Sequence, residues 1–103
     1  MYKARIEVTL KKKILDPQGK AIESSLRNLG FLKLGGVRTG KNIDMSVNES
    51  NIDAAIALVT SACAKLLANP VTEDYECEIF DEAGKQVAQF SSAQGGASKV
   101  AAK

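Results

Sequence analysis

The chain has 103 residues, 45% of them hydrophobic, and a formal net charge of +2. This length predicts one domain with its own core and leaves no room for a barrel or a doubly wound nucleotide domain. The chain has no histidine, which removes the most frequent general acid–base and metal ligand. No stretch approaches the roughly 20 apolar residues of a membrane helix, and no signal peptide precedes Lys3 and Arg5. We therefore expect a cytoplasmic protein with no membrane partner.

The N-terminal part of the chain predicts a strand followed by a helix. Residues 2–10 alternate strictly between apolar and polar side chains, which is the period of a half-buried strand. Asp16 is a good N-cap, and Pro17 fits the first helical position. Gly30 is placed to end the helix in a left-handed conformation.

The next segment predicts a β-hairpin. Residues 31–39 are expected to form a second strand and residues 43–47 a third, joined by a tight turn at Gly40 and Lys41. The same stretch has the G-x-x-x-x-G-K spacing of a phosphate-binding loop. However, Asn42 stands where such a loop needs Ser or Thr, and a strand pattern follows instead of a helix. A hairpin is therefore favoured over a phosphate site.

The second half of the chain predicts one long helix and a fourth strand. Residues 50–53 resemble a capping box with Asp in place of Glu. Apolar residues then follow helical spacing to residue 67, and Asn69-Pro70 stops the helix. Residues 75–79 alternate again as a strand.

The predicted order is β-α-β-β-α-β, an α+β fold. Two helices on one face of an antiparallel four-stranded sheet bury these apolar stripes most simply, as in the ferredoxin-like two-layer sandwich. The first strand would then lie beside the fourth, so that Lys3 and Arg5 would neighbour Glu76 and Glu78. We expect a short extra strand at residues 86–90. Residues 91–103 lack bulky apolar side chains apart from one valine and are expected to be disordered.

Charge is distributed unevenly along the chain. Residues 1–41 carry ten basic and three acidic residues, whereas residues 71–82 carry six acidic residues and no basic one. Cross-strand pairing explains this pattern without a nucleic-acid partner, and the five aromatic residues offer no evident exposed pair for stacking on bases.

The cysteines Cys63 and Cys77 fall on predicted core faces. They are expected to be reduced core residues, because the chain offers no histidine base and no second cysteine pair for a metal site. The residues themselves therefore indicate a small domain without catalytic equipment, either an adaptor or a regulatory module.

Three segments in this order resemble the PurS family, the small subunit of phosphoribosylformylglycinamidine synthase. They are LDPQGKA at residues 15–21, VRTGK at residues 37–41 and LLANPVTEDY at residues 66–75. The resemblance covers residues 2–80. We therefore expect a family domain at residues 1–80 and a C-terminal extension at residues 81–103.

The resemblance implies a non-catalytic subunit of an ATP-dependent carbon–nitrogen ligase in de novo purine biosynthesis. The glutaminase PurQ releases ammonia from glutamine. The synthetase PurL uses it with ATP to convert formylglycinamide ribonucleotide to formylglycinamidine ribonucleotide. PurS would pair with itself, as a dimer or a dimer of dimers, bridge PurL and PurQ, and assist ammonia transfer. ATP, Mg and glutamine would bind the partners, and this chain would hold no cofactor or metal.

Polar residues in the family-like turns are the expected partner contacts: Asp16, Gln18, Lys20, Arg38, Lys41, Asn69 and Glu73. Capping and helix-stop roles already explain Asp16 and Asn69. The alternative is a ferredoxin-like regulatory module that binds a small effector at a dimer interface, lined by Gly35-Gly36 and residues 16–20.

Overall fold

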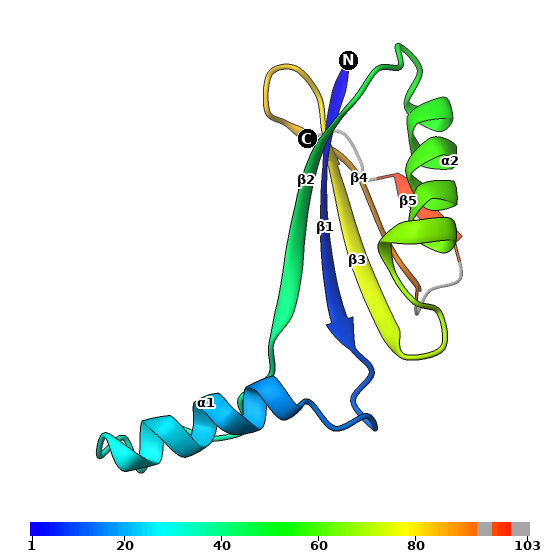
Figure 1. The fold of residues 1–103 in the computed structure, drawn as a ribbon. Coiled ribbons are helices and arrows are strands. Elements are labelled where there is room, and N and C mark those ends of the chain that lie inside the picture. Colours follow the sequence, from blue (N-terminus) through cyan, green and yellow to red (C-terminus); the bar gives the residue numbers. More distant parts are fainter. Residues whose placement is uncertain (93–95, 100–103) are drawn as a thin grey trace.

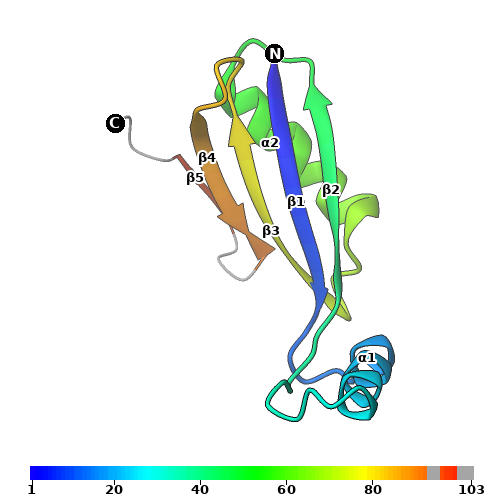
Figure 2. The same cartoon turned by 90° about the vertical axis from the view of Figure 1, so that its left-hand side faces the viewer.

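The computed structural model describes residues 1–92 and the backbone of residues 96–99. Its elements are β1 (Tyr2–Leu10), α1 (Pro17–Asn28), β2 (Gly40–Val47), α2 (Ile52–Ala62), the π-helical segment η1 (Cys63–Leu67), β3 (Glu73–Phe80), β4 (Gln86–Ser91) and β5 (Gly96–Lys99). The strands form one antiparallel sheet in the order β2-β1-β3-β4-β5 (Figures 1 and 2). The α+β class, with an open antiparallel sheet and two helices, is confirmed.

Strand β1 is an inner strand of the sheet, between β2 and β3. Arg5 stands opposite Glu78 on β3 and Asp44 on β2, and its Nε lies 3.3 Å from Asp44 Oδ1. The predicted pairing of basic and acidic strands is therefore confirmed for Arg5. Lys3 instead stands opposite Phe80, so the charge asymmetry is only partly explained by cross-strand pairs.

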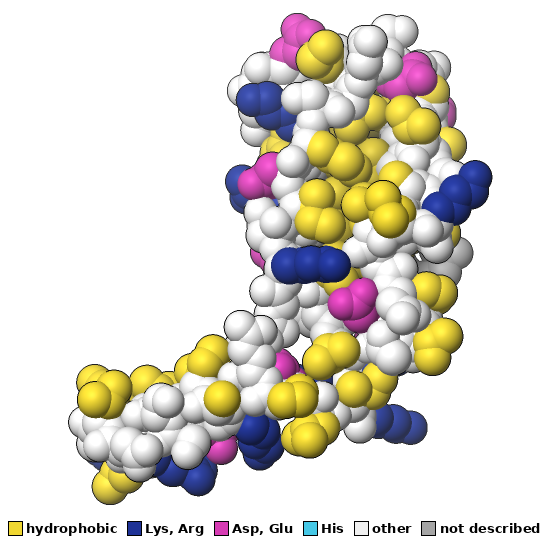
Figure 3. All heavy atoms as spheres, viewed as in Figure 1, with side chains coloured by type: hydrophobic (Ala, Val, Ile, Leu, Met, Phe, Trp, Pro, Cys, Tyr) yellow, Lys and Arg dark blue, Asp and Glu magenta, His cyan; other side chains and the backbone are white. Residues whose placement is uncertain are grey.

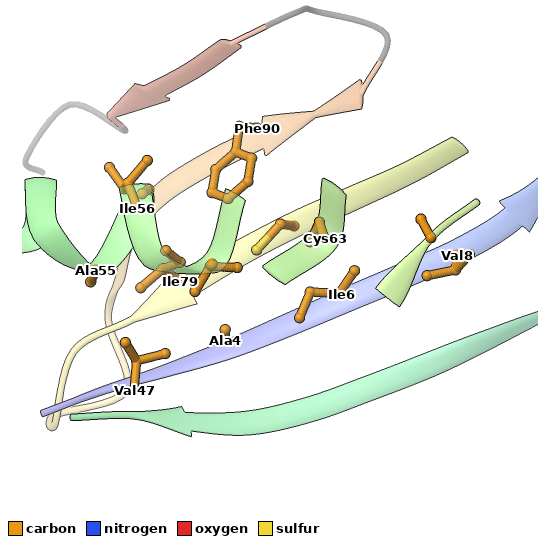
Figure 4. Close-up of a cluster of buried hydrophobic side chains, with 13 residues drawn as sticks. Ala4, Ile6, Val8, Val47, Ala55, Ile56, Cys63, Ile79 and Phe90 are labelled. Atoms are coloured by element: carbon orange, nitrogen blue, oxygen red, sulfur yellow. The ribbon is translucent and has the colours of Figure 1, made fainter. Parts of the chain in front are cut away.

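The core lies between α2 and one face of the sheet (Figure 4). The alternation in β1 places Ala4, Ile6 and Val8 on that face, each at most 2% exposed. Cys63 and Cys77 are fully buried free thiols, as predicted. Burying such side chains stabilises the fold at roughly 25 cal/mol per Å² of apolar surface removed from water.

The predicted long helix is observed as α2 continued by η1. Its N-cap is Asn51, not Ser50: Asn51 Oδ1 accepts the N–H groups of Asp53 and Ala54, at 2.7 and 3.3 Å. Side-chain capping of this kind satisfies donors that the first turn leaves free. The helix ends before Pro70, as predicted.

The strand predicted at residues 31–39 is absent, and Gly40 is not in a turn. Gly30, with φ +94°, ends the helix region as expected, but the chain then returns along α1 as an irregular segment. Carboxylates on α1 and just before it, not a neighbouring strand, bind its backbone N–H groups. Gly40 begins β2 opposite Thr9, where a Cβ would come within 2.6 Å of the Val8 carbonyl oxygen.

Of the two helices expected on one face of the sheet, only α2 covers it. Helix α1 projects from the end of the sheet, away from α2 (Figures 1 and 2). The only buried residues of α1 are Gly19 and Glu23. The apolar stripe read from the sequence therefore has no sheet to pack against within the chain.

The predicted strand at residues 86–90 is confirmed as β4, and it contributes Ala88 and Phe90 to the core. The prediction of disorder from residue 91 onward is wrong for residues 96–99, which form β5 along β4. Backbone pairing at a strand edge needs no bulky side chains, which a composition argument overlooks. Residues 93–95 and 100–103, also covered by that prediction, lie outside the described residues.

Phe90 tests how far β4 belongs to the core. The residue is 1% exposed, and its ring meets Tyr75 edge-on, with ring centroids 6.3 Å apart. We expect Phe90→Ala to lower the free energy of unfolding by about 3–5 kcal/mol, through lost apolar contact and the cavity left behind. Urea titration measures this. Gln89→Ala, at an exposed position on the same strand, is the control. A loss below about 1 kcal/mol for Phe90→Ala would place β4 outside the core.

Candidate functional site at the junction of α1 and the sheet

A hollow of about 460 Å³ lies where α1 leaves the sheet. It receives side chains from the ends of β1 and β2, from the first turn of α1 and from the start of β3. Four of the seven predicted site residues line it: Asp16, Gln18, Lys41 and Glu73. Segments far apart in the sequence therefore meet at one place, which we call the junction.

Asp16 fastens the start of α1 to the start of β2. The residue is 3% exposed. Oδ1 accepts the N–H of Gly19 at 3.0 Å, which confirms the predicted N-cap. Oδ2 accepts the N–H and the hydroxyl of Thr39, at 2.6 and 2.8 Å. These bonds, the one from the Thr39 N–H above all, favour the charged form and lower the pKa of Asp16 to about 2.

Arg38 fastens the two linkers of α1 to each other. Its guanidinium donates to the carbonyl oxygens of Ile14 at 2.9 Å, Lys11 at 3.0 Å and Leu10 at 3.3 Å. The planar fork of five donors suits such a group of carbonyls, and Lys cannot reproduce it. Arg38 therefore does not flank a hairpin, as the sequence suggested; it crosses from the segment before β2 to the segment after β1.

Glu23 makes a second carboxylate contact along α1. It is 8% exposed; Oε1 accepts the N–H of Val37 at 3.2 Å, and Oε2 lies 3.3 Å from Arg27 Nη2. The Val37 N–H is the main cause of the lowered pKa of Glu23. Gly19 allows the same close approach, because a Cβ there would collide with the Val37 carbonyl oxygen.

The remaining predicted residues surround the junction. Lys20 is exposed on α1 and does not line the hollow. Asn69 lies in the turn between η1 and β3, where its Oδ1 accepts the N–H of Val71 at 2.9 Å. The Asn69 N–H donates to Glu73 Oε1 at 2.7 Å, so Asn69 reaches the hollow through Glu73. Asn69, which was predicted to stop the helix, therefore forms a hydrogen-bonded turn after it.

Thr39 and Glu23 hold the junction together, and the sequence pattern did not reveal them. Thr39 lies 23 residues from Asp16, and Glu23 lies 14 residues from Val37. The available signal was an acidic residue, Glu23, beside the apolar stripe of an amphipathic helix. A carboxylate in such a position needs hydrogen-bond donors, and here the returning backbone supplies one.

The junction and the core offer binding groups rather than reactive ones. Burial, the main cause, raises the pKa of Cys77 to about 12 and also raises the pKa of Cys63, so both thiols stay protonated and weakly nucleophilic. Among the residues that the structure describes, no three metal-ligating side chains form a cluster, and no helix is long and apolar enough to cross a membrane. Gly40 and Lys41 open a strand, so the glycine-rich stretch lacks the helix of a phosphate loop.

The Asp16 contacts predict acid sensitivity. The pKa of Asp16 falls from 3.8 in the unfolded chain to about 2 in the fold. The stabilisation is therefore complete above about pH 4 and is lost as the pH falls toward 2. Asp16→Asn should lower the urea midpoint at pH 7, and the gap from the unsubstituted chain should shrink toward pH 2.

Urea midpoints between pH 7 and pH 2 measure this gap. Asp44→Asn, which removes an exposed carboxylate on β2, is the control and should shift the midpoint little. A gap for Asp16→Asn that is equal at pH 7 and pH 2 would contradict a role for the charged form.

The junction lies within a region shared with known proteins. Residues 3–81 match the family model PurS, phosphoribosylformylglycinamidine (FGAM) synthase. The PurS subunit of this synthase from Bacillus subtilis strain 168 is 40% identical over 79 residues, which are 77% of this chain and 93% of that protein. The crystal form C2 structure of B. subtilis PurS superposes with a TM-score of 0.71 at 38% identity, covering 79% of this chain and all of that one.

A third similarity is to an assembly. A chain in the structure of PurLQS from Thermotoga maritima superposes with a TM-score of 0.69 at 38% identity, covering 74% of this chain and 93% of that one. The matched region contains every residue of the junction and ends before β4. This chain belongs to the PurS family of phosphoribosylformylglycinamidine synthase subunits.

Proposed function

We propose that this chain is the small, non-catalytic subunit of phosphoribosylformylglycinamidine synthase in purine biosynthesis, and that it links the synthetase PurL to the glutaminase PurQ. The observation that carries the proposal is the match over residues 3–81, together with the likeness to a chain of the PurLQS structure. In this role the chain belongs to a carbon–nitrogen ligase but contributes no catalytic group, and it works in the cytoplasm with its partners.

The junction gives such a subunit two surfaces in a fixed relation. One is the sheet with α2, which shares a buried core. The other is α1 with the segment that returns along it, held by Asp16, Glu23 and Arg38. A fixed relation between the two contact surfaces favours binding to two enzymes, because ordering the surfaces on association would cost free energy.

The chemistry of the ligase belongs to the partners in this proposal. ATP, Mg and glutamine are used by PurL and PurQ, and ammonia passes from PurQ to PurL while the complex is assembled. Five of the predicted contact residues are exposed on the surface: Gln18, Lys20, Arg38, Lys41 and Asn69. Arg38 and Asn69 also bind backbone groups of this chain. Asp16 is less suited to a partner or to a small effector, because both its oxygens are bound to Gly19 and Thr39.

The choice of nitrogen donor tests the bridging role. In a complex reconstituted from PurL, PurQ and this chain, omission of the chain should abolish most glutamine-dependent turnover, because ammonia escapes to water before it reaches PurL. Turnover with free ammonia and ATP should persist. Steady-state rates with the two donors measure this. Equal loss with both donors would mean that the chain acts in the synthetase step itself.

Arg38 tests whether the junction sets the geometry of the complex. Arg38→Ala removes three hydrogen bonds to backbone carbonyls, while the core stays intact. We expect about tenfold weaker binding to PurL and PurQ, a loss of about 1.4 kcal/mol, because α1 and its linkers would then have to be ordered on association. When the concentration of this chain is too low to saturate its partners, glutamine-dependent turnover should fall in parallel. Arg38→Lys should be nearly as impaired as Arg38→Ala.

Lys33→Ala is the matched control, because it removes an exposed positive charge from the same segment. Titration of the immobilised synthetase with each variant gives the affinities, and thermal unfolding verifies the fold. Identical losses for Lys33→Ala and Arg38→Ala would indicate a general charge effect and not a positioned junction.

A further inference from the structure

A second hollow lies between η1 and the ends of β3 and β4, and it has a volume of about 560 Å³. We call it the η1 hollow. Small-molecule sites in proteins commonly occupy roughly 300–1,000 Å³. One of its walls is formed by Phe90, Ser91 and Ser92, which lie beyond the residues 3–81 that match the PurS family model. The hollow is therefore a feature of this chain that the family match does not describe.

The η1 hollow offers apolar surface to a ligand. Ala64 and Ala68 line it from η1 and from the residue that follows η1, and Pro70 lines it from the next turn. Tyr75 and Phe90 line it from the sheet, where their rings meet edge-on. Figure 3 shows apolar side chains gathered beside α2, with charged side chains at the margin. π-helical turns such as η1 occur frequently at functional sites. The hollow can therefore receive an apolar group.

An ion pair also lines the hollow. Lys11 Nζ lies 3.1 Å from Asp74 Oδ1, and the Ser92 hydroxyl donates to the same oxygen at 3.3 Å. Asp74 Oδ2 accepts no hydrogen bond from the described residues, and the ammonium of Lys11, which has three donors, donates only to Asp74 among them. The side chains of Lys11 and Asp74 are 39% and 43% exposed. Each charge therefore keeps the capacity to bind a second partner.

The balance of charge in the hollow indicates the kind of ligand. Asp74 and Glu73 both line it, and Lys11 is the one basic residue among the described residues that do so. A phosphate group would meet two carboxylates and one ammonium, so repulsion disfavours a nucleotide. A ligand with one ammonium and one carboxylate instead complements both members of the ion pair, because charge-assisted hydrogen bonds are stronger than neutral ones.

We propose that the η1 hollow binds a free α-amino acid with an apolar side chain. The ammonium group of the ligand donates to Asp74 Oδ2, and its carboxylate accepts from Lys11. The α-carbon joins these two charged groups, so that they reach the two neighbouring charges of the ion pair together. The apolar side chain lies between η1 and the rings of Tyr75 and Phe90, where it is removed from water.

This inference goes beyond the proposed function, and it is tested on the full chain without PurL or PurQ. Its failure would leave the bridging role untouched, and failure of the bridging role would leave this site in place. The competing ligands are a nucleotide, which the charge balance disfavours, and an amine without a carboxylate. The experiments distinguish these three kinds of ligand.

The first experiment maps binding by NMR titration of the isotopically labelled chain. L-leucine and L-phenylalanine at millimolar concentration should shift the amide signals of residues 64–75 and 90–92, while those of α1 stay in place. Leucinamide, which lacks the carboxylate, and N-acetylleucine, which lacks the ammonium, should bind at least about tenfold more weakly. Glycine should also bind more weakly, because it lacks an apolar side chain. Adenosine monophosphate should leave these signals unchanged.

The second experiment changes the site. Asp74→Asn should weaken leucine binding at least about tenfold, because an amide does not pair with the ammonium group of the ligand. Asp44→Asn also removes a carboxylate from an exposed ion pair, but outside the hollow, so this matched control should leave the affinity unchanged. Ala64→Phe fills the hollow from an exposed position and should abolish binding. Thermal unfolding verifies that each variant folds.

Several results would overturn the proposal. One is the absence of any shift around the hollow with either apolar amino acid at millimolar concentration. Another is leucinamide that binds as tightly as leucine, which would make the hollow an amine site, or adenosine monophosphate that binds more tightly, which would make it a nucleotide site. A third is an equal affinity for leucine in the Asp74→Asn and Asp44→Asn variants.

Discussion

The Asp16 carboxylate is the contact on which the placement of α1 depends. It caps α1 through Gly19 and binds both donors of Thr39 just before β2. Strands β1 and β2 are antiparallel neighbours, so the chain between them must leave the end of the sheet and return to it. The buried Asp16 carboxylate joins the two ends of this connection, because it binds Gly19 after β1 and Thr39 before β2. The same bonds lower the pKa of Asp16, because they favour its charged form.

Around this contact, α1 and its two linkers are held together by contacts of their own. Arg38 joins the two linkers, and Glu23 binds the returning backbone farther along α1. These are polar contacts, whereas the sheet and α2 are held by apolar burial. The division matters for function, because a polar junction can hold an apolar surface open to a partner without collapsing over it.

Much of the sheet and of α2 could be predicted because local pattern and tertiary role agree there. The alternation of residues 2–10 reflects one buried and one solvated face, and the spacing from Ile52 onward reflects one covered helix stripe. The strand predicted at residues 31–39 was wrong because the hydrophobic residues there do not face a core. Phe31, Leu32 and Leu34 are at least half exposed. Alternating apolar residues indicate a strand only where one face is buried within the chain, and these residues are not buried.

Part of the candidate site could also be predicted from the sequence. Turn residues with a local reason, such as Asp16 before a helix and Asn69 before Pro70, were found from the sequence, and Gln18, Lys41 and Glu73 do meet them at the junction. Arg38 was singled out, but its carbonyl partners were not, because a guanidinium contact across 24 to 28 residues leaves no periodic signal. Thr39 and Glu23 were missed for the same reason.

The strands after β3 lie beyond the family match yet are coupled to the junction. Ser92, directly after β4, accepts the N–H of Tyr75 at 3.0 Å, and its hydroxyl donates to Asp74 at 3.3 Å. Asp74 in turn lies 3.1 Å from Lys11 Nζ, and Lys11 supplies one of the carbonyls that Arg38 binds. A continuous set of polar contacts thus runs from β4 through β3 to the linker of α1. Because β4 also pairs with the edge of β3, residues beyond the family match cover one edge of the strands within it, whereas β2 is an open edge of the described sheet.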